Sequence, residues 1–196
     1  MKDIRIAAVV LNCPVGETAA NLAAVKEFTG RAAAGGADLV CFPELNITGY
    51  CNRPDLADVA LALDGPEVAA ASETARTHGI VVLAGMAETD AAGNVYASHL
   101  VLTPNGGVGV YRKVHIAPPE KGIFTAGDEV PVFSAAGTRF GVQLCYDAHF
   151  PELSAAMTAK GAEVIFIPHA SPRGSAAEKH DSWMRHLPAR AFDNSV

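Results

Sequence analysis

Glu44, Lys113 and Cys145 each stand at the end of an apolar run that reads as a buried strand. A cysteine thiolate can attack a carbonyl carbon, a glutamate can take the proton of the thiol, and a lysine can stabilise the oxyanion that develops. Because α/β enzymes usually place their working groups at the ends of strands, the three residues are candidates for one site. The chemistry they would support is nucleophilic catalysis by a thiol.

Cys145 lies where a predicted strand turns into a helix that begins at Pro151. A thiol at such a turn can reach the floor of a cleft, and the nearby helix start and a cation would lower its pKa and favour the thiolate. The alternative is a buried core cysteine, which is the commoner fate of an isolated cysteine. That second interpretation is the one we favour for Cys13, Cys41 and Cys51.

A solvated side chain is the ordinary alternative for the two charged residues. Lys113, however, closes an apolar strand and is followed by Val-His-Ile-Ala-Pro-Pro, which is not typical of a surface turn. Glu44 follows Phe-Pro and would otherwise be a solvated carboxylate at the end of a strand. Spacing alone leaves open whether either residue meets Cys145.

The elements that must position these residues alternate between apolar runs and helix-like segments, which predicts an α/β fold. The first part reads as βαβ, whereas turn signals at Gly93-Asn94 and 105–107 indicate antiparallel hairpins in the middle. This mixture argues against a simple doubly wound sheet and favours a sandwich of two mixed sheets with helices outside. The predicted strands are Ile4–Leu11, Asp38–Phe42, Ile80–Ala87, Val95–Leu102, Val108–Lys113, Val132–Ala135, Phe140–Leu144 and Val164–Ile167, and the predicted helices are Thr18–Ala34, Gly65–Thr77, Pro151–Lys160 and Ala177–Phe192.

Composition and charge restrict the classes of protein that fit the chain. Its 196 residues, 49% hydrophobic and 18% charged, suit one globular domain with a substantial core. The formal net charge of −6 comes without a basic stripe, so no nucleic-acid partner is expected, and no stretch is long and apolar enough to span a membrane. The four cysteines form no CxxC pair and no zinc-binding cluster with histidine, which indicates reduced thiols in the cytoplasm and no metal site.

Three short blocks of sequence resemble the signature blocks of the carbon–nitrogen hydrolase (nitrilase) superfamily, and they occur in the family order. The blocks are Phe42-Pro43-Glu44-Leu45, Tyr111-Arg112-Lys113-Val114-His115, and Leu144-Cys145-Tyr146-Asp147 with Phe150-Pro151-Glu152. The resemblance covers essentially the whole chain, so residues 1–196 are expected to form a single domain of this family. It implies a four-layer αββα sandwich, two mixed sheets flanked by helices.

The resemblance also implies a role for each residue of the site. Glu44 is the general base, Lys113 stabilises the oxyanion together with the backbone N–H of Tyr146, and Cys145 is the nucleophile. Glu120 matches a second glutamate of the family, which implies that it hydrogen-bonds Lys113 and helps to place the substrate. A loop glutamate in water is the alternative for Glu120. The chemistry needs no metal or organic cofactor.

Three further residues are weaker candidates for substrate binding. Tyr146 follows the nucleophile, His115 lies near Lys113 and could instead pack, and Arg173 sits on a loop after a strand, where it could bind a carboxylate or be an ordinary surface arginine. Asp147 is expected to have a structural role by resemblance.

The function predicted first is hydrolysis of a small linear amide or N-carbamoyl compound. Hydrolysis of a small nitrile by the same triad is the near alternative, although Cys-Tyr-Asp resembles amidase relatives more than the Cys-Trp-Glu of true nitrilases. A non-catalytic assembly protein on the same fold is the alternative from another class. Family members are usually longer, so the domain is expected to be truncated at its C-terminus. The resemblance further implies a homodimer or larger homo-oligomer, with Glu152–Lys160 and Ala177–Phe192 as interface candidates.

Overall fold

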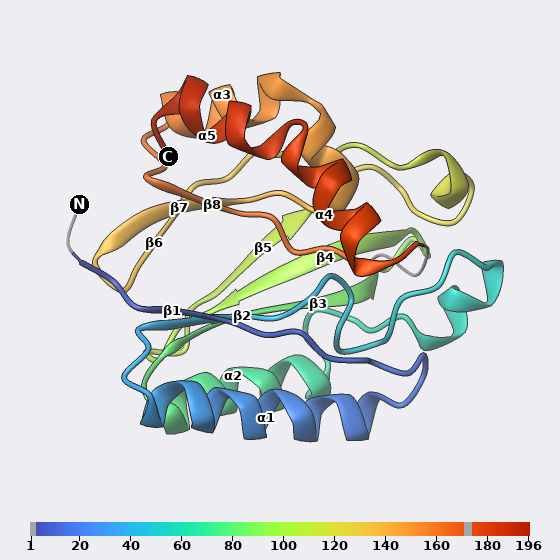
Figure 1. Ribbon diagram of the computed structural model, residues 1–196. Coiled ribbons are helices and arrows are strands. Elements are labelled where there is room, and N and C mark those ends of the chain that lie inside the picture. The colour runs from blue at the N-terminus through green and yellow to red at the C-terminus, as the bar shows by residue number, and fades with distance from the viewer. Residues whose placement is uncertain (1–2, 171–173) are drawn as a thin grey trace.

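The computed structural model describes residues 3–170 and 174–196 and contains two β-sheets (Figure 1). The five-stranded sheet has the spatial order β1 (Ile6–Ala8), β2 (Leu39–Cys41), β3 (Val81–Thr89), β4 (Val95–Leu102) and β5 (Val108–Arg112). The three-stranded sheet has the order β6 (Phe133–Ala135), β7 (Thr138–Val142) and β8 (Val164–Phe166). The helices are α1 (Thr18–Ala34), α2 (Pro66–His78), α3 (Pro151–Ala159), α4 (Ala176–Met184) and α5 (Leu187–Asn194), with 3₁₀ turns η1 (Pro54–Val59), η2 (Pro118–Glu120) and η3 (Cys145–His149).

Both sheets are mixed, as the sequence predicts. β1 pairs with β2 and β2 with β3 in parallel, whereas β3, β4 and β5 form an antiparallel meander. In the second sheet, β6 pairs with β7 antiparallel and β7 pairs with β8 in parallel. The parallel pairs follow helical crossovers, and the antiparallel pairs follow short turns, because only a crossover can bring the chain back in the same direction.

The helices lie on the outer sides of the two sheets (Figure 1). α1 and α2 cover one face of the five-stranded sheet, and α3 and α5 lie over the three-stranded sheet. Two apolar clusters follow from this arrangement. One lies between α1, α2 and the first sheet and includes Val25, Val68 and Val82; the other joins the two sheets and includes Leu83 and Phe140.

Two predicted elements were wrong in extent. The run Ile4–Leu11 is not a buried strand, because β1 is short and lies at the edge of its sheet, where Ile6 is 39% and Val10 94% exposed. The single helix predicted at Ala177–Phe192 is two helices, α4 and α5. Pro188 lies in the first turn of α5, and a proline there has no N–H to continue a preceding helix and clashes with the carbonyl four residues back.

None of the helices in residues 3–170 and 174–196 combines the length and the apolar character needed to cross a bilayer. The four cysteines are free thiols, as their spacing predicts.

His99 is a fully buried histidine on β4 whose two ring nitrogens have no hydrogen-bond partner among the described residues. Burial lowers its pKa to about 3, so the folded protein keeps His99 neutral. The associated stability is complete above the unfolded-state pKa of about 6.5 and is lost as the pH falls toward 3, because only the unfolded chain takes up the proton.

We therefore expect His99→Leu to make the protein less sensitive to acid. Between pH 7 and pH 4 the wild type should lose about 3 kcal/mol more unfolding free energy than the variant, as measured by urea denaturation. Replacement of the exposed His180 by Gln serves as the control and should leave the wild-type pH dependence unchanged. Equal losses in the wild type and His99→Leu would contradict a neutral buried imidazole.

Candidate active site

Glu44 lies in a tight turn that is packed against β3. Asn46 Oδ1 accepts a hydrogen bond of 2.7 Å from the Gly85 N–H, and the Ile47 N–H donates to the Gly85 carbonyl at 2.8 Å. A Cβ at Gly85 would lie 2.5 Å from the Leu45 nitrogen, so only glycine permits this close approach. Leu45 itself has a φ of 53°, a left-handed conformation that is uncommon for a branched side chain. In this turn Glu44 is only 2% exposed.

Lys113 follows β5 and is fully buried. Its backbone is held on both sides, since its N–H donates to the Ala97 carbonyl at 2.9 Å and its carbonyl accepts from the Gly127 N–H at 2.8 Å. Its Nζ donates to Glu44 Oε1 at 2.8 Å and to both carboxylate oxygens of Glu120 at 2.9 and 3.0 Å. The expected hydrogen bond between Glu120 and Lys113 is therefore present.

Glu120 belongs to the short turn η2 and is as buried as Glu44. The Ala117 N–H donates to its Oε2 at 3.1 Å, and the Tyr50 hydroxyl donates to its Oε1 at 2.9 Å. Sequence reasoning missed Tyr50; the signal that could have found it is an aromatic residue directly after Thr48-Gly49, a few residues beyond Glu44.

Cys145 begins the turn η3 directly after Leu144, and its N–H donates to the Pro168 carbonyl at 3.1 Å. Its φ of 47° is left-handed, and such backbone strain in a non-glycine residue tends to occur at functional sites. Unlike Glu44, Lys113 and Glu120, Cys145 is partly exposed.

The buried charged groups shift the pKa values of one another. Burial lowers the pKa of Lys113, but the adjacent carboxylates of Glu44 and Glu120 outweigh this effect, so its pKa is raised and the ammonium stays charged. Burial raises the pKa of Glu44, and the repulsion of Glu120 adds to it, whereas Lys113 and a hydrogen bond from the Ala170 N–H act in the opposite direction. The net result is a Glu44 carboxylate that is more basic than an ordinary glutamate.

The expected low pKa of Cys145 is wrong. Burial and, after it, the negative charges of Glu44 and Glu120 raise the pKa of its thiol to about 12, although Lys113 acts in the opposite direction. Lys113 favours the thiolate, as expected, but burial and the charge of Glu44 outweigh its effect. At neutral pH the sulfur therefore rests as the thiol, and its reaction requires a base that removes the proton.

Two of the weaker candidates, Tyr146 and His115, contact the segment that follows Cys145. Tyr146 is partly exposed and meets Phe150 edge to face, with ring centroids 5.4 Å apart. His115 stacks on Phe150 at 3.6 Å, and its Nδ1 lies 3.0 Å from Asp147 Oδ1, so it packs against the nucleophile turn. Arg173 lies outside the described residues. In the described parts of the chain, no group of three or more His, Cys, Asp or Glu side chains is arranged to hold a metal ion.

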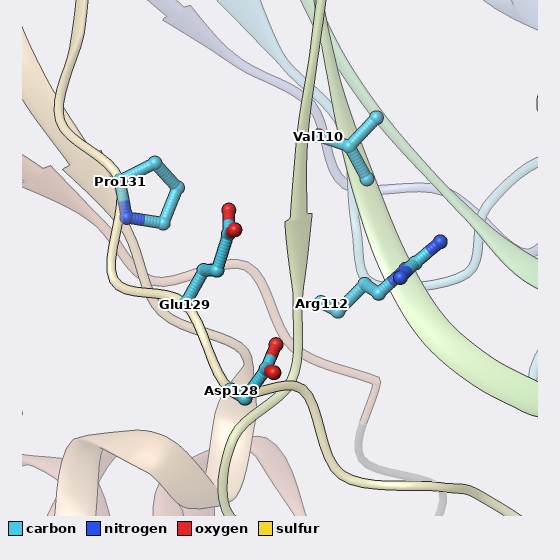
Figure 2. A pocket seen from close by; sticks show the side chains of 5 residues that line it. All are labelled: Val110, Arg112, Asp128, Glu129 and Pro131. Atoms are coloured by element: carbon cyan, nitrogen blue, oxygen red, sulfur yellow. The ribbon is translucent and has the colours of Figure 1, made fainter.

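A surface hollow of about 150 Å³ lies apart from these residues, between β5 and the loop that follows η2. Figure 2 shows Asp128, Glu129 and Pro131 on the loop and Val110 and Arg112 on the strand. The Arg112 guanidinium extends away from the two acidic side chains (Figure 2). It pairs instead with Glu88. None of the lining residues belongs to the cluster around Lys113, so this hollow is not the candidate active site.

Residues 5–196 match the carbon-nitrogen hydrolase family, so the chain belongs to this family. The resemblance to the nitrilase superfamily that the three sequence blocks predicted is confirmed. Among characterised relatives, an (R)-stereoselective amidase from Pseudomonas sp. is 35% identical over 152 residues, which are 78% of this chain and 55% of that protein. A nitrilase from Pyrococcus abyssi (strain GE5 / Orsay) is 33% identical over 198 residues, covering 98% of this chain and 72% of that protein.

Solved structures agree with this assignment. An amidase from Nesterenkonia sp. superposes with a TM-score of 0.85 and 28% identity, covering 98% of this chain and 73% of that one. A double mutant of the amidase from Nesterenkonia sp. AN1 is known in complex with acrylamide, and another mutant carries the acetamide moiety of fluoroacetamide covalently on its active-site cysteine. The chain thus spans a little over half of the Pseudomonas amidase and about three quarters of the Nesterenkonia chain.

Proposed function

We propose that this chain hydrolyses the C–N bond of a small linear amide or N-carbamoyl compound through a thioester on Cys145. The observation that carries the proposal is the buried cluster in which Lys113 bonds Glu44 and Glu120 while the charges of all three act on the Cys145 thiol. Such a cluster supplies a nucleophile, a base and an oxyanion partner in one place.

In the first half of the proposed reaction, Glu44 takes the thiol proton as the Cys145 sulfur attacks the carbonyl carbon. The raised pKa of Glu44 suits it to this task, because proton transfer is most effective when the base is not far weaker than the acid. The carbonyl electrons move to oxygen, and Lys113 with the Tyr146 N–H stabilises the oxyanion. Glu44 then protonates the leaving nitrogen, the C–N bond breaks, and ammonia or an amine departs.

In the second half, water hydrolyses the thioester. Glu44 takes a proton from the water molecule while the water oxygen attacks the acyl carbon. When the C–S bond breaks, Glu44 gives this proton to the Cys145 sulfur. The product is a carboxylic acid from an amide, or a carbamic acid from an N-carbamoyl compound. Glu120 holds Lys113 in place during both halves, with Tyr50 fixing Glu120 in turn.

The comparisons support small amides as the substrate class. Mutants of the Nesterenkonia amidase bind acrylamide and butyramide, and both ligands carry a primary amide on a short chain. A nitrile remains the second candidate, because the Pyrococcus abyssi relative is a nitrilase and a cysteine nucleophile can also add to a nitrile carbon.

The test is ammonia release from a panel of aliphatic amides, N-carbamoyl amino acids and nitriles. Turnover of amides or carbamoyl compounds would establish the proposed substrate class. Turnover of nitriles alone would show that the protein acts as a nitrilase. If folded protein releases no ammonia from any compound of the panel, the result would favour the non-catalytic assembly protein.

Glu44→Gln should reduce the turnover found in that panel by roughly 10²- to 10⁴-fold, because the amide side chain keeps the shape but cannot take a proton. Stopped-time assays of ammonia release would measure the loss. Glu67→Gln, at a partly exposed glutamate in the first turn of α2, is the matched control and should retain wild-type activity. Retention of more than about a tenth of the activity in Glu44→Gln would remove Glu44 from the proposed role.

We also propose that the protein forms a homodimer or larger homo-oligomer and acts in the cytoplasm. The interface candidates Glu152–Lys160 and Ala177–Phe192 map to α3, α4 and α5. On the last two helices Met184 is 53% and Phe192 86% exposed, as expected of a surface that another copy covers. Light scattering of the wild type and Phe192→Glu would test this association.

A further inference from the structure

The carboxylate of Asp147 is fully buried and is surrounded by hydrogen-bond donors. Its Oδ2 accepts from the Tyr111 hydroxyl at 2.7 Å and from the Leu144 N–H at 3.0 Å. Its Oδ1 accepts from the His115 N–H at 2.8 Å, and the His115 Nδ1 lies 3.0 Å from the same oxygen. Hydrogen bonds to a buried charged acceptor are among the strongest in proteins, so this carboxylate is a rigid junction.

The junction connects two segments that matter for the site. Tyr111 and His115 stand two residues before and two residues after Lys113, whereas Leu144 directly precedes Cys145. One carboxylate therefore holds both flanks of Lys113 against the turn that carries the nucleophile. The stacking of His115 on Phe150, at 3.6 Å and with ring planes 6° apart, adds a second contact between the same two segments.

We propose that Asp147 is a positioning residue that sets the place of the Lys113 ammonium relative to the Cys145 sulfur. The inference rests on the proposed function, because Asp147 acts through the roles proposed there for Lys113 and Cys145. Asp147 itself has no contact with the substrate in this proposal. A displacement of about 1 Å between reacting groups can cost on the order of 10²-fold in rate, so a junction of this kind controls turnover without taking part in the chemistry.

Asp147→Asn tests the proposal with almost no change in shape. One carboxylate oxygen accepts a hydrogen bond from the His115 N–H and the other accepts one from the Leu144 N–H. In either orientation the amide nitrogen of asparagine therefore faces one of these donors, and that hydrogen bond is lost. We expect kcat to fall by roughly 10- to 100-fold, with KM changed by less than about threefold.

The second readout is the rate at which iodoacetamide alkylates Cys145 at pH 9, followed by mass spectrometry of the peptide. Lys113 lowers the pKa of the Cys145 thiol, so a displaced ammonium should leave less thiolate and slow alkylation by roughly three- to tenfold. A residue that only stabilises the fold would act in the opposite direction, because a loosened turn exposes the sulfur and speeds alkylation.

Two further variants keep the test decisive. Tyr111→Phe removes a single hydroxyl from the junction and should change kcat and alkylation in the same direction but by less, even if Asp147→Asn does not fold. Asp90→Asn is the matched control, since Asp90 also accepts from a tyrosine hydroxyl, Tyr96, and from the Ala92 and Asn94 N–H groups, but lies on the exposed hairpin between β3 and β4. Its alkylation rate should equal that of the wild type.

Unchanged or faster alkylation in both Asp147→Asn and Tyr111→Phe would overturn the positioning role. The alkylation readout needs no substrate, so it separates the two proposals. If the wild type hydrolyses nothing while alkylation slows as expected, the proposed function fails and the positioning of Lys113 stands.

Discussion

Cys145→Ala should reduce ammonia release from every substrate found for this protein by roughly 10⁴-fold or more. The proposed intermediate is a thioester, which requires the Cys145 sulfur, whereas Glu44, Lys113 and Glu120 carry no sulfur and are paired with one another. The variant should remain folded, since Cys145 is partly exposed and its backbone N–H still reaches the Pro168 carbonyl. Circular dichroism and an ammonia assay on the same preparation would measure both properties.

Cys41→Ala is the matched control for this experiment. Burial raises the pKa of the Cys41 thiol to about 12, the same value as for Cys145, but Cys41 lies within β2 and has no part in the proposed reaction. We therefore expect full activity in Cys41→Ala. Comparable loss in both variants would mean that the effect comes from a disturbed fold and would remove Cys145 as the nucleophile.

Lys113→Met should lower the free energy of unfolding by about 3–5 kcal/mol at pH 8 and abolish measurable turnover. The substitution leaves the Glu44 and Glu120 carboxylates buried against each other without their cation. A buried charge without a partner destabilises a protein far more than a buried ion pair stabilises it. The loss of unfolding free energy therefore comes from the two carboxylates that remain and not from the missing lysine side chain.

The pH dependence of this loss has a definite sign. Removal of the ammonium raises the pKa of the Glu44 carboxyl group further in the folded variant, because burial and the repulsion of Glu120 are then opposed only by the hydrogen bond from the Ala170 N–H. A group with a raised pKa contributes stability below its unfolded-state value and loses it as the pH rises through the folded value. Lys113→Met should therefore be nearly as stable as the wild type near pH 4–5. The difference in unfolding free energy between the two proteins should increase as the pH rises.

Urea denaturation at pH 4.5 and pH 8 would check this prediction, with the exposed Lys121→Met as the control that should change little at either pH. A loss of equal size at both pH values would show that the carboxylates are not the cause.

Elements whose ends depend on near neighbours in the sequence lie where the sequence predicts them. Helix α1 begins and ends at the predicted residues, and so does strand β4, because their boundaries are set by neighbours in sequence. Gly36, with a φ of 75°, stops α1, and the turn containing Gly93, with a φ of 81°, precedes β4. The three sequence blocks likewise predicted the family that the comparisons show.

The extent of exposure was less predictable. The run Ile4–Leu11 has the composition of a buried strand, but its position at the edge of a sheet leaves much of it in solvent. Nothing within eight residues of sequence distinguishes an edge strand from a central one, since the difference lies in which distant strand pairs with it.

The sequence by itself determined the residue types of the candidate site and their places at strand ends. Only the tertiary structure decided that Glu44 and Lys113, 69 residues apart, share a hydrogen bond, and that Tyr50 and Asp147 hold the cluster. It also decided that the pKa of Cys145 is raised, where the sequence predicted that it is lowered. The physical reason is that helix caps and turns depend on near neighbours, whereas burial and the balance of charges around a thiol depend on every segment that the fold brings to it.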